Sequence, residues 1–172
     1  SLTAFNSNGF SLGADADNTY GNTVNQNAKT YASWNWRTGT SFTNDASATG
    51  IGTIDSTGSV NTDAGFSIVS YSGNSTAGAT IGHGLGATPK MMIVRKRNSA
   101  ENWLVYHAST GNTGATLLNG TNAFFQDDMW NSTSPTSSVF TVHGGAGANA
   151  SGGTYIAYCF TDVKGYSKFS SY

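Results

Sequence analysis

The stretch "GFSIVSYS" (residues 65–72) decides the fold class, because its side chains alternate with a period of two. In an extended chain, Phe66 and Ile68 project to one side. Val69 and Tyr71 project to the other side. This alternation predicts a half-buried β-strand, since a helix would need apolar residues three and four positions apart.

Further strand-like segments follow, separated by glycine, proline or asparagine. The predicted strands are "KMMIVRKR" (90–97), "NWLVYH" (102–107), "SSVFTVH" (137–143) and "GTYIAYCFTDV" (153–163). Between them, "GATIGHGLGATP" (78–89) predicts a loop that Pro89 closes. The Asn-Gly in "ATLLNGTNAFFQ" (115–126) predicts a tight hairpin. Roughly seven or eight short strands with turn signals about every 8–12 residues are typical of an all-β antiparallel β-sandwich. Jelly-roll-like and immunoglobulin-like topologies fit equally well.

The composition supports the all-β class and excludes several functions. Hydrophobic residues make up 37% of the 172 residues, enough for a core, whereas charged residues make up only 10%, against about 25% in an ordinary domain. Ser, Thr, Asn and Gly therefore carry the solubility, and these residues disfavour helix interiors. A net charge of −1 gives no field for phosphates, so we expect no nucleic-acid partner. The apolar run "MMIV" (91–94) is too short for membrane insertion.

Two internal pairs of similar segments predict a tandem array. "TYASWNW" (30–36) resembles "TYIAYCF" (154–160), and "GYSKFSSY" (165–172) resembles "GFSIVSY" (65–71). Repeated segments in a consistent order are the signature of tandem modules.

These pairs give a domain plan. Residues 1–39 are the closing hairpin of a preceding β-sandwich-like domain, with strands near 5–12 and 30–37. Residues 40–59 form a linker, and residues 60–163 form the β-sandwich module. Residues 164–172 are a terminal strand that either begins a further copy or completes this one.

Catalytic and metal-binding groups are scarce. Adjacent residues on a strand point to opposite faces, so Asp127 and Asp128 make a poor acid–base pair. "DADNTYGN" (15–22) begins like a calcium loop but lacks the turn glycine and the bidentate glutamate. The single cysteine, Cys159, lies between aromatic residues and is expected to be a small buried hydrophobe. We therefore expect no enzyme activity, no cofactor and no metal.

The best candidate for recognition is the loop "FFQDDMWNSTSPT" (124–136). An exposed Trp130 with Asp127, Asp128 and Asn131 nearby would bind a sugar ring, which offers an apolar face and hydroxyl groups. Alternatively, Trp130 closes one end of the sandwich core, as most tryptophans are largely buried. His83, between two glycines, is either a further candidate ligand-binding residue at a loop tip or a hydrogen-bonding turn residue.

Three stretches carry a family resemblance. They are "AGFSIVSYSGNSTAGATIGHGLGATPKMMIVRKRNSAENWLVYH" (64–107), "MWNSTSPTSSVFTV" (129–142) and "GTYIAYCFTDVKGYSKFSSY" (153–172). They resemble a family of virion proteins of bacteriophages, marine phages and cyanophages in particular, in which the module recurs in tail-fibre and particle-surface proteins. The front part, "FNSNGFSLG" (5–13) through "TYASWNWRTG" (30–39), resembles the closing strands of lectin-like sandwich domains. The family has no assigned catalytic residues to carry over.

The resemblance and the composition together imply a function class. We expect a non-enzymatic structural or adhesive module of a phage particle, in a tail fibre or on the capsid surface, that takes part in host attachment. The expected partners are other virion proteins, two further copies in a homotrimer and a host surface glycan. The expected location is extracellular, on the virion surface or tail. The alternative is a carbohydrate-binding module that acts through residues 124–136.

Overall fold

The computed structural model describes residues 2–13 and 24–171, and the chain divides into two compact units, Ser1–Asn35 and Trp36–Tyr172. Strands account for 39% of the residues and helices for 5%. The all-β fold class predicted from the alternating pattern is therefore confirmed.

The first unit contains one hairpin, which differs from the predicted one. Strand β1 (Leu2–Asn6) pairs with strand β2 (Gly9–Leu12) in antiparallel register. The predicted strand near 5–12 is thus interrupted by a turn, because Ser7 and Asn8 form a two-residue connection. Residues 30–37, predicted as its partner strand, are exposed and form no strand. The calcium-like stretch 15–22 lies outside the described residues.

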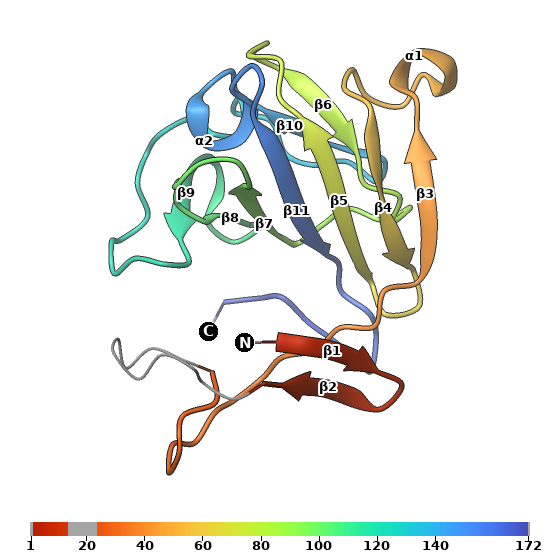
Figure 1. Cartoon of the computed structure of the whole chain (residues 1–172). Helices are drawn as coiled ribbons and strands as arrows, with labels where there is room; N and C mark the ends of the chain where they lie inside the picture. Colours follow the sequence, from red (N-terminus) through yellow and green to blue (C-terminus); the bar gives the residue numbers. More distant parts are fainter. Residues whose placement is uncertain (1, 14–23, 172) are drawn as a thin grey trace. The chain divides into compact units, whose positions relative to one another are not determined.

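The second unit is a two-layer sandwich (Figure 1). Its main layer is a seven-stranded antiparallel sheet in the order β3-β4-β5-β11-β7-β8-β9, and the second layer contains the β10-β6 pair. The strands are β3 (Thr40–Asn44), β4 (Ser56–Asn61), β5 (Phe66–Ser72), β6 (Ala79–Gly82), β7 (Met91–Lys96), β8 (Leu104–His107), β9 (Gly111–Leu117), β10 (Val139–Val142) and β11 (Thr154–Phe160). Two single-turn helices, α1 (Ala46–Thr49) and α2 (Ala146–Asn149), join strands.

Residues 40–59 are not a linker, which corrects the predicted domain plan. They contain β3 and most of β4, which pair with each other and extend the main sheet beyond β5. Position 58 requires glycine because its neighbours leave no room for a side chain, and not because of an unusual backbone conformation. A Cβ there would meet the Ile68 carbonyl oxygen at 2.2 Å and the Phe42 ring at 3.0 Å. The strands at this edge carry small polar residues because one side of the sheet remains open to solvent.

The predicted loop at residues 78–89 also contains a strand. Its residues Ala79–Gly82 form β6, which pairs with β10 over its whole length. Ile81 is fully buried between the layers. Gly78 precedes β6 and Gly82 ends it, so the sequence pattern predicted a loop here instead of a buried strand.

Strand β11 is the centre of the module. It pairs with β5 along seven residues and with β7 along six, so Ala157 lies between Val69 and Val94. The inward side chains of these strands meet those of β6, β10 and the connecting loops. The largest fully buried ones are Trp130, Tyr155, Phe140, Ile81, Met92 and His83.

Residues 164–171 do not form a strand. The only pairing there is an isolated bridge between Val163 and Ser167. Phe169 instead packs its ring on Phe160, with the centroids 5.4 Å apart. The expectation of a terminal strand is wrong for this segment, whereas a further copy beyond it stays a prediction.

Phe160→Ala should lower the free energy of unfolding by about 3–5 kcal/mol. Phe160 is 5% exposed, and its ring centroid lies 5.0 Å from that of Phe66 and 5.7 Å from that of Trp36. Urea unfolding followed by circular dichroism would measure the loss. Tyr166→Ala is the matched control, because Tyr166 is 69% exposed, and it should change stability by less than about 0.5 kcal/mol. Equal effects of the two variants would contradict a stabilising role of the Phe66–Phe160 contact.

Candidate functional site

Trp130 belongs to the core rather than to a sugar-binding loop. Its side chain is fully buried, and its indole Nε1–H donates to the Gly114 carbonyl at 2.9 Å. Its ring meets Tyr106 edge-on, at 5.9 Å between centroids. The interpretation of Trp130 as a core residue is confirmed, and its proposed stacking against a sugar is wrong.

The three polar residues of the 124–136 loop do not converge on a common point. The Asp128 carboxylate accepts from the backbone N–H and the hydroxyl of Ser132, which closes a local turn. Asn131 lies in that turn with a φ of 52°. Asp127 instead lines a small pocket of about 290 Å³ with Glu101 and Met129. The loop therefore offers no combined carboxylate and amide site around an aromatic ring.

His83 is buried, which also corrects its prediction as a ligand-binding residue at a loop tip. Its Nδ1 accepts from the Leu85 N–H at 3.2 Å, and its Nε2 lies 3.2 Å from the Thr136 carbonyl. These contacts fit a neutral ring with the proton on Nε2. Burial lowers the pKa of His83 below its ordinary value, and the contact with Thr136 counteracts this in part. His83 therefore ties two loops together inside the sandwich.

Cys159 is fully buried and unsuited to nucleophilic chemistry. Burial raises the pKa of its thiol to about 12. A thiol with that pKa holds almost no thiolate at neutral pH. The expectation of a small buried hydrophobe is confirmed.

The main sheet leaves one face open, here called the outer face, on the side opposite β6 and β10 (Figure 1). Directly paired residues share a face, so the register places Ile68, Tyr158 and Ile93 in one row of it. All three are only half-buried, whereas Val69 and Ala157, which point the other way, are fully buried. The outer face thus carries partly exposed side chains in this row, whereas Phe66 and Phe160, further along the same face, are buried against Trp36 and Phe169.

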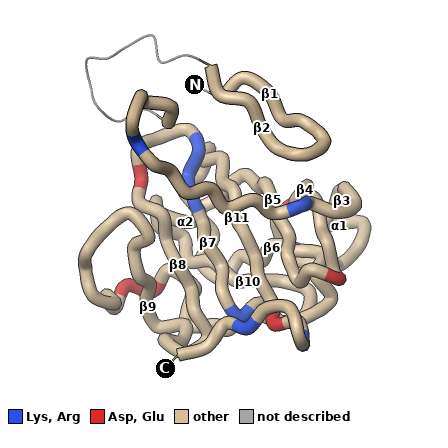
Figure 2. Tube along the Cα trace, turned by 90° about the horizontal axis from the view of Figure 1, so that it is seen from below, with Lys and Arg blue, Asp and Glu red and all other residues tan. Residues whose placement is uncertain are grey.

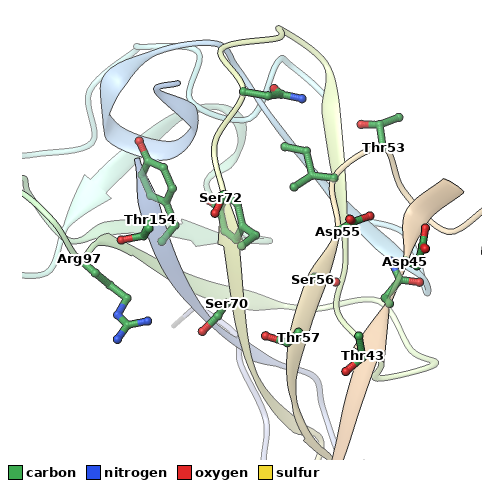
Figure 3. Close-up of a pocket in the computed structure, with 15 residues that line it drawn as sticks. Thr43, Asp45, Thr53, Asp55, Ser56, Thr57, Ser70, Ser72, Arg97 and Thr154 are labelled. Carbon is green, nitrogen blue, oxygen red and sulfur yellow. The ribbon is translucent and has the colours of Figure 1, made fainter. Parts of the chain in front are cut away.

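A groove lies at the end of the main sheet beside β3, β4, β5 and β11, and residues of both faces line it (Figure 3). We call it the polar groove, and its volume is about 820 Å³, within the range of small-molecule sites. Its lining residues are Thr43, Asn44, Asp45, Thr53, Ile54, Asp55, Ser56, Thr57, Ser70, Tyr71, Ser72, Asn74, Arg97, Thr154 and Tyr155.

Hydroxyl groups form two rows across the floor of the polar groove. In the first row, Thr43 pairs with Thr57, which pairs with Ser70. In the second row, Ser72 pairs with Thr154. Within residues 2–13 and 24–171, none of these five hydroxyls has a hydrogen-bond partner. They are therefore available to a ligand.

The two ends of the groove carry opposite charges. Arg97 stands at one end, beside Thr154, whose carbonyl accepts from the Arg97 backbone N–H at 2.7 Å. In the part of the chain that the structure describes, its guanidinium has no ion pair and no hydrogen bond. Asp45 and Asp55 stand at the other end (Figure 3).

The carboxylates at that end are held by the start of helix α1. One oxygen of Asp45 accepts from the Ser47 hydroxyl at 2.7 Å and from the Ala48 N–H at 3.1 Å. These bonds lower the pKa of Asp45, with the Ser47 hydroxyl as the larger cause. One oxygen of Asp55 accepts from the Ala46 N–H at 2.9 Å. A carboxylate has about four acceptor sites, so both groups can still accept from a further donor.

An aromatic pair lies further along the outer face. Trp103 stacks on Tyr158, with centroids 6.4 Å apart and planes 16° apart. The Arg95 guanidinium lies 5.5 Å from the Trp103 ring centroid. Arg95 shares a row with Ser70 through Ile156, so the aromatic pair continues the surface of the polar groove.

The chemistry of this arrangement is suited to binding. Hydroxyl groups, a free guanidinium and fixed carboxylates donate and accept hydrogen bonds in a defined order. Among the described residues, no group of three or more His, Cys, Asp or Glu side chains could hold a metal ion. The described helices are also all too short to cross a membrane.

Sequence reasoning missed the polar groove. Thr57, Ser70 and Thr154 come from three strands, and only the register of the sheet brings them together. The available signal was the hydroxyl residues at alternate positions in β4 and β5, which mark a polar half of each strand.

The comparisons with known proteins give a family without a function. A family model described as "Domain of unknown function (DUF7483)" matches residues 1–172. No curated protein and no solved structure matches the chain.

The stability of the protein should fall as the pH drops below about 6.5, in part because of His83. Burial lowers the folded pKa of His83 below 6.5, so the unfolded chain binds a proton that the folded chain rejects. The stability due to the neutral ring is complete above about pH 6.5 and is lost as the pH falls through the folded pKa. The loss approaches about 1.4 kcal/mol per pH unit. Urea unfolding between pH 8 and pH 5 would measure it.

The control for this prediction separates His83 from other titrating groups. His143→Gln alters a histidine whose side chain is exposed and is the control for removing a histidine. His83→Asn should be less stable at pH 8 but should lose less stability on acidification. An unchanged slope in His83→Asn would contradict the assignment.

Proposed function

The chain belongs to the family described as Domain of unknown function (DUF7483), and we propose that it is a non-enzymatic adhesive module of a bacteriophage particle. It acts in a tail fibre or on the capsid surface and takes part in host attachment. The observation that carries this proposal is the outer face of the main sheet, which offers a preformed, partly exposed surface with the polar groove at one end.

The rigidity of the module supports an adhesive role. Binding surfaces on paired strands are held in place by the ladder of backbone hydrogen bonds, so little ordering entropy is lost on binding. The hydroxyl rows lie on β3, β4, β5 and β11, which are joined in continuous register. A preformed face of this kind suits a protein that must bind on first contact with a cell.

The surface chemistry also supports a role outside the cell. Figure 2 shows charged residues as short isolated stretches along a largely uncharged trace. With 8 Lys and Arg and 9 Asp and Glu among 172 residues, solubility depends on hydroxyl and amide groups. Such a surface keeps its properties over a wide range of salt, because hydrogen bonds are less screened than ion pairs. The resemblance to phage particle proteins favours the same location.

The groups around the polar groove favour binding over catalysis. Serine and threonine hydroxyls and a guanidinium keep their protonation state near neutral pH, and the Asp45 and Asp55 carboxylates are already hydrogen-bonded at the start of α1. His83 and Cys159, which would be the usual catalytic groups, are both buried in the core. We therefore place the function in recognition rather than in reaction chemistry.

Adhesion can be tested with the labelled protein and a panel of bacterial cells that includes marine bacteria and cyanobacteria. We expect saturable retention on the cells of at least one strain, and no release of reducing sugar from its purified surface polysaccharide. Release of reducing sugar would show an enzyme. If the protein shows saturable retention on none of the strains, the adhesive role is refuted.

The particle role also predicts the oligomeric state. For a role in a tail fibre we expect a homotrimer with each core buried in its own protomer. Light scattering should give a mass three times the 17.8 kDa of the chain. The mass of a monomer at all concentrations would contradict the trimer.

A further inference from the structure

We propose that the polar groove binds a carboxylate-bearing sugar ring, such as a hexuronate, next to a neutral ring in a surface polysaccharide. This inference rests on the proposed adhesive function and names the ligand class of the groove. The site replaces the 124–136 loop, whose Trp130 is buried.

The guanidinium of Arg97 identifies the acidic part of the ligand. It is exposed at the end of the groove and has no partner among the described residues. A guanidinium binds a carboxylate through two parallel hydrogen bonds, which gives both strength and direction. The hydroxyls of Ser72 and Thr154 lie beside it in the adjoining row and can donate to the same carboxylate.

The hydroxyl rows match the remaining groups of a sugar. Neighbouring strands are about 4.8 Å apart, a spacing comparable to the width of a sugar ring. Thr57 and Ser70, on adjacent strands, can therefore contact hydroxyls on two sides of one ring. Each protein hydroxyl both donates and accepts, as does each sugar hydroxyl, so the row does not require a fixed charge in the ligand.

The acidic end of the groove sets the order of the rings. The carboxylates of Asp45 and Asp55 can accept further hydrogen bonds from neutral hydroxyls but repel a second carboxylate. The charge pattern thus favours one acidic ring near Arg97 and a neutral ring towards α1. A ligand with a carboxylate on every ring fits less well.

The aromatic pair extends the site along the outer face. Trp103 and Tyr158 offer a partly exposed ring surface, and the apolar side of a sugar ring stacks on such surfaces. The Arg95 guanidinium lies over part of the Trp103 ring, so a sugar would stack on the ring surface that remains exposed. A polysaccharide that fills the groove can therefore continue onto the aromatic pair.

The test compares two disaccharides that differ in one group. Cellobiouronic acid carries a carboxylate where cellobiose carries a hydroxymethyl group. In titrations followed by NMR chemical shifts, the wild-type protein should bind cellobiouronic acid several-fold more tightly than cellobiose. Arg97→Gln should lose this preference. Thr57→Val should bind both disaccharides several-fold more weakly than the wild type does. Equal affinities in the wild type, or an unchanged preference in Arg97→Gln, would overturn the proposal.

Lys96→Gln is the matched control, because it removes the same charge from the neighbouring position. Lys96 pairs with the core residue Tyr155, so it lies on the opposite face of the sheet from Arg97. This variant should keep the wild-type preference for the acid. A loss equal to that of Arg97→Gln would show a general charge effect and would also overturn the proposal.

The same variants separate this proposal from the adhesive function. If the wild type and Arg97→Gln are retained equally on cells, the groove is not the site, although adhesion stands. If Arg97→Gln is retained at least tenfold more weakly and Lys96→Gln is not, the groove is the site. Failure of the wild type to bind any cells would refute adhesion itself.

Discussion

The register of β11 between β5 and β7 is the constraint on which the rest of the structure depends. Strand side chains alternate, so a slip of one residue would carry Tyr155, Ala157 and Cys159 from the core to the outer face. It would also place Tyr158 and Ile156 between the layers. The stacked Tyr71 and Tyr155 oppose such a slip, with centroids 5.1 Å apart. Their hydroxyls donate to the Ala148 and Ala146 carbonyls, which fixes α2 over the sheet end.

The same register that closes the core also builds the outer face. Each strand contributes alternate residues to the two sides. The packing of the core therefore also fixes the positions of the side chains on the outer face. Thr154 can stand opposite Ser72 only because Tyr155 stands opposite Tyr71. A change in the core that shifts β11 would therefore displace Thr154 in the polar groove, even without a substitution among the lining residues.

Sequence reasoning succeeded where one strand carries its own signal. The alternation in residues 65–72 and 153–163 marked β5 and β11, and the apolar runs marked β7, β8 and β10. It failed for β3 and β4, because an edge that is open to solvent has no apolar pattern and its glycines suggested a linker. Gly58 was required by the Phe42 ring, a contact between strands that no local pattern reveals. Trp130 and the polar groove depend on the same kind of non-local contact, so the residue types were visible in the sequence but their neighbours were not.

The low charge of the module links its binding chemistry to its expected assembly. A groove of hydroxyls exchanges hydrogen bonds with water for hydrogen bonds with a sugar, so each contact contributes only about 1 kcal/mol or less. The single guanidinium adds direction, but an exposed charge pair also contributes little. One groove is therefore a weak binder, and strong attachment requires several grooves that engage one polysaccharide. Linked sites raise the effective concentration of each further contact and increase avidity by orders of magnitude. A repeating polysaccharide and a multi-copy particle protein are matched in this respect, because both supply the same contact many times.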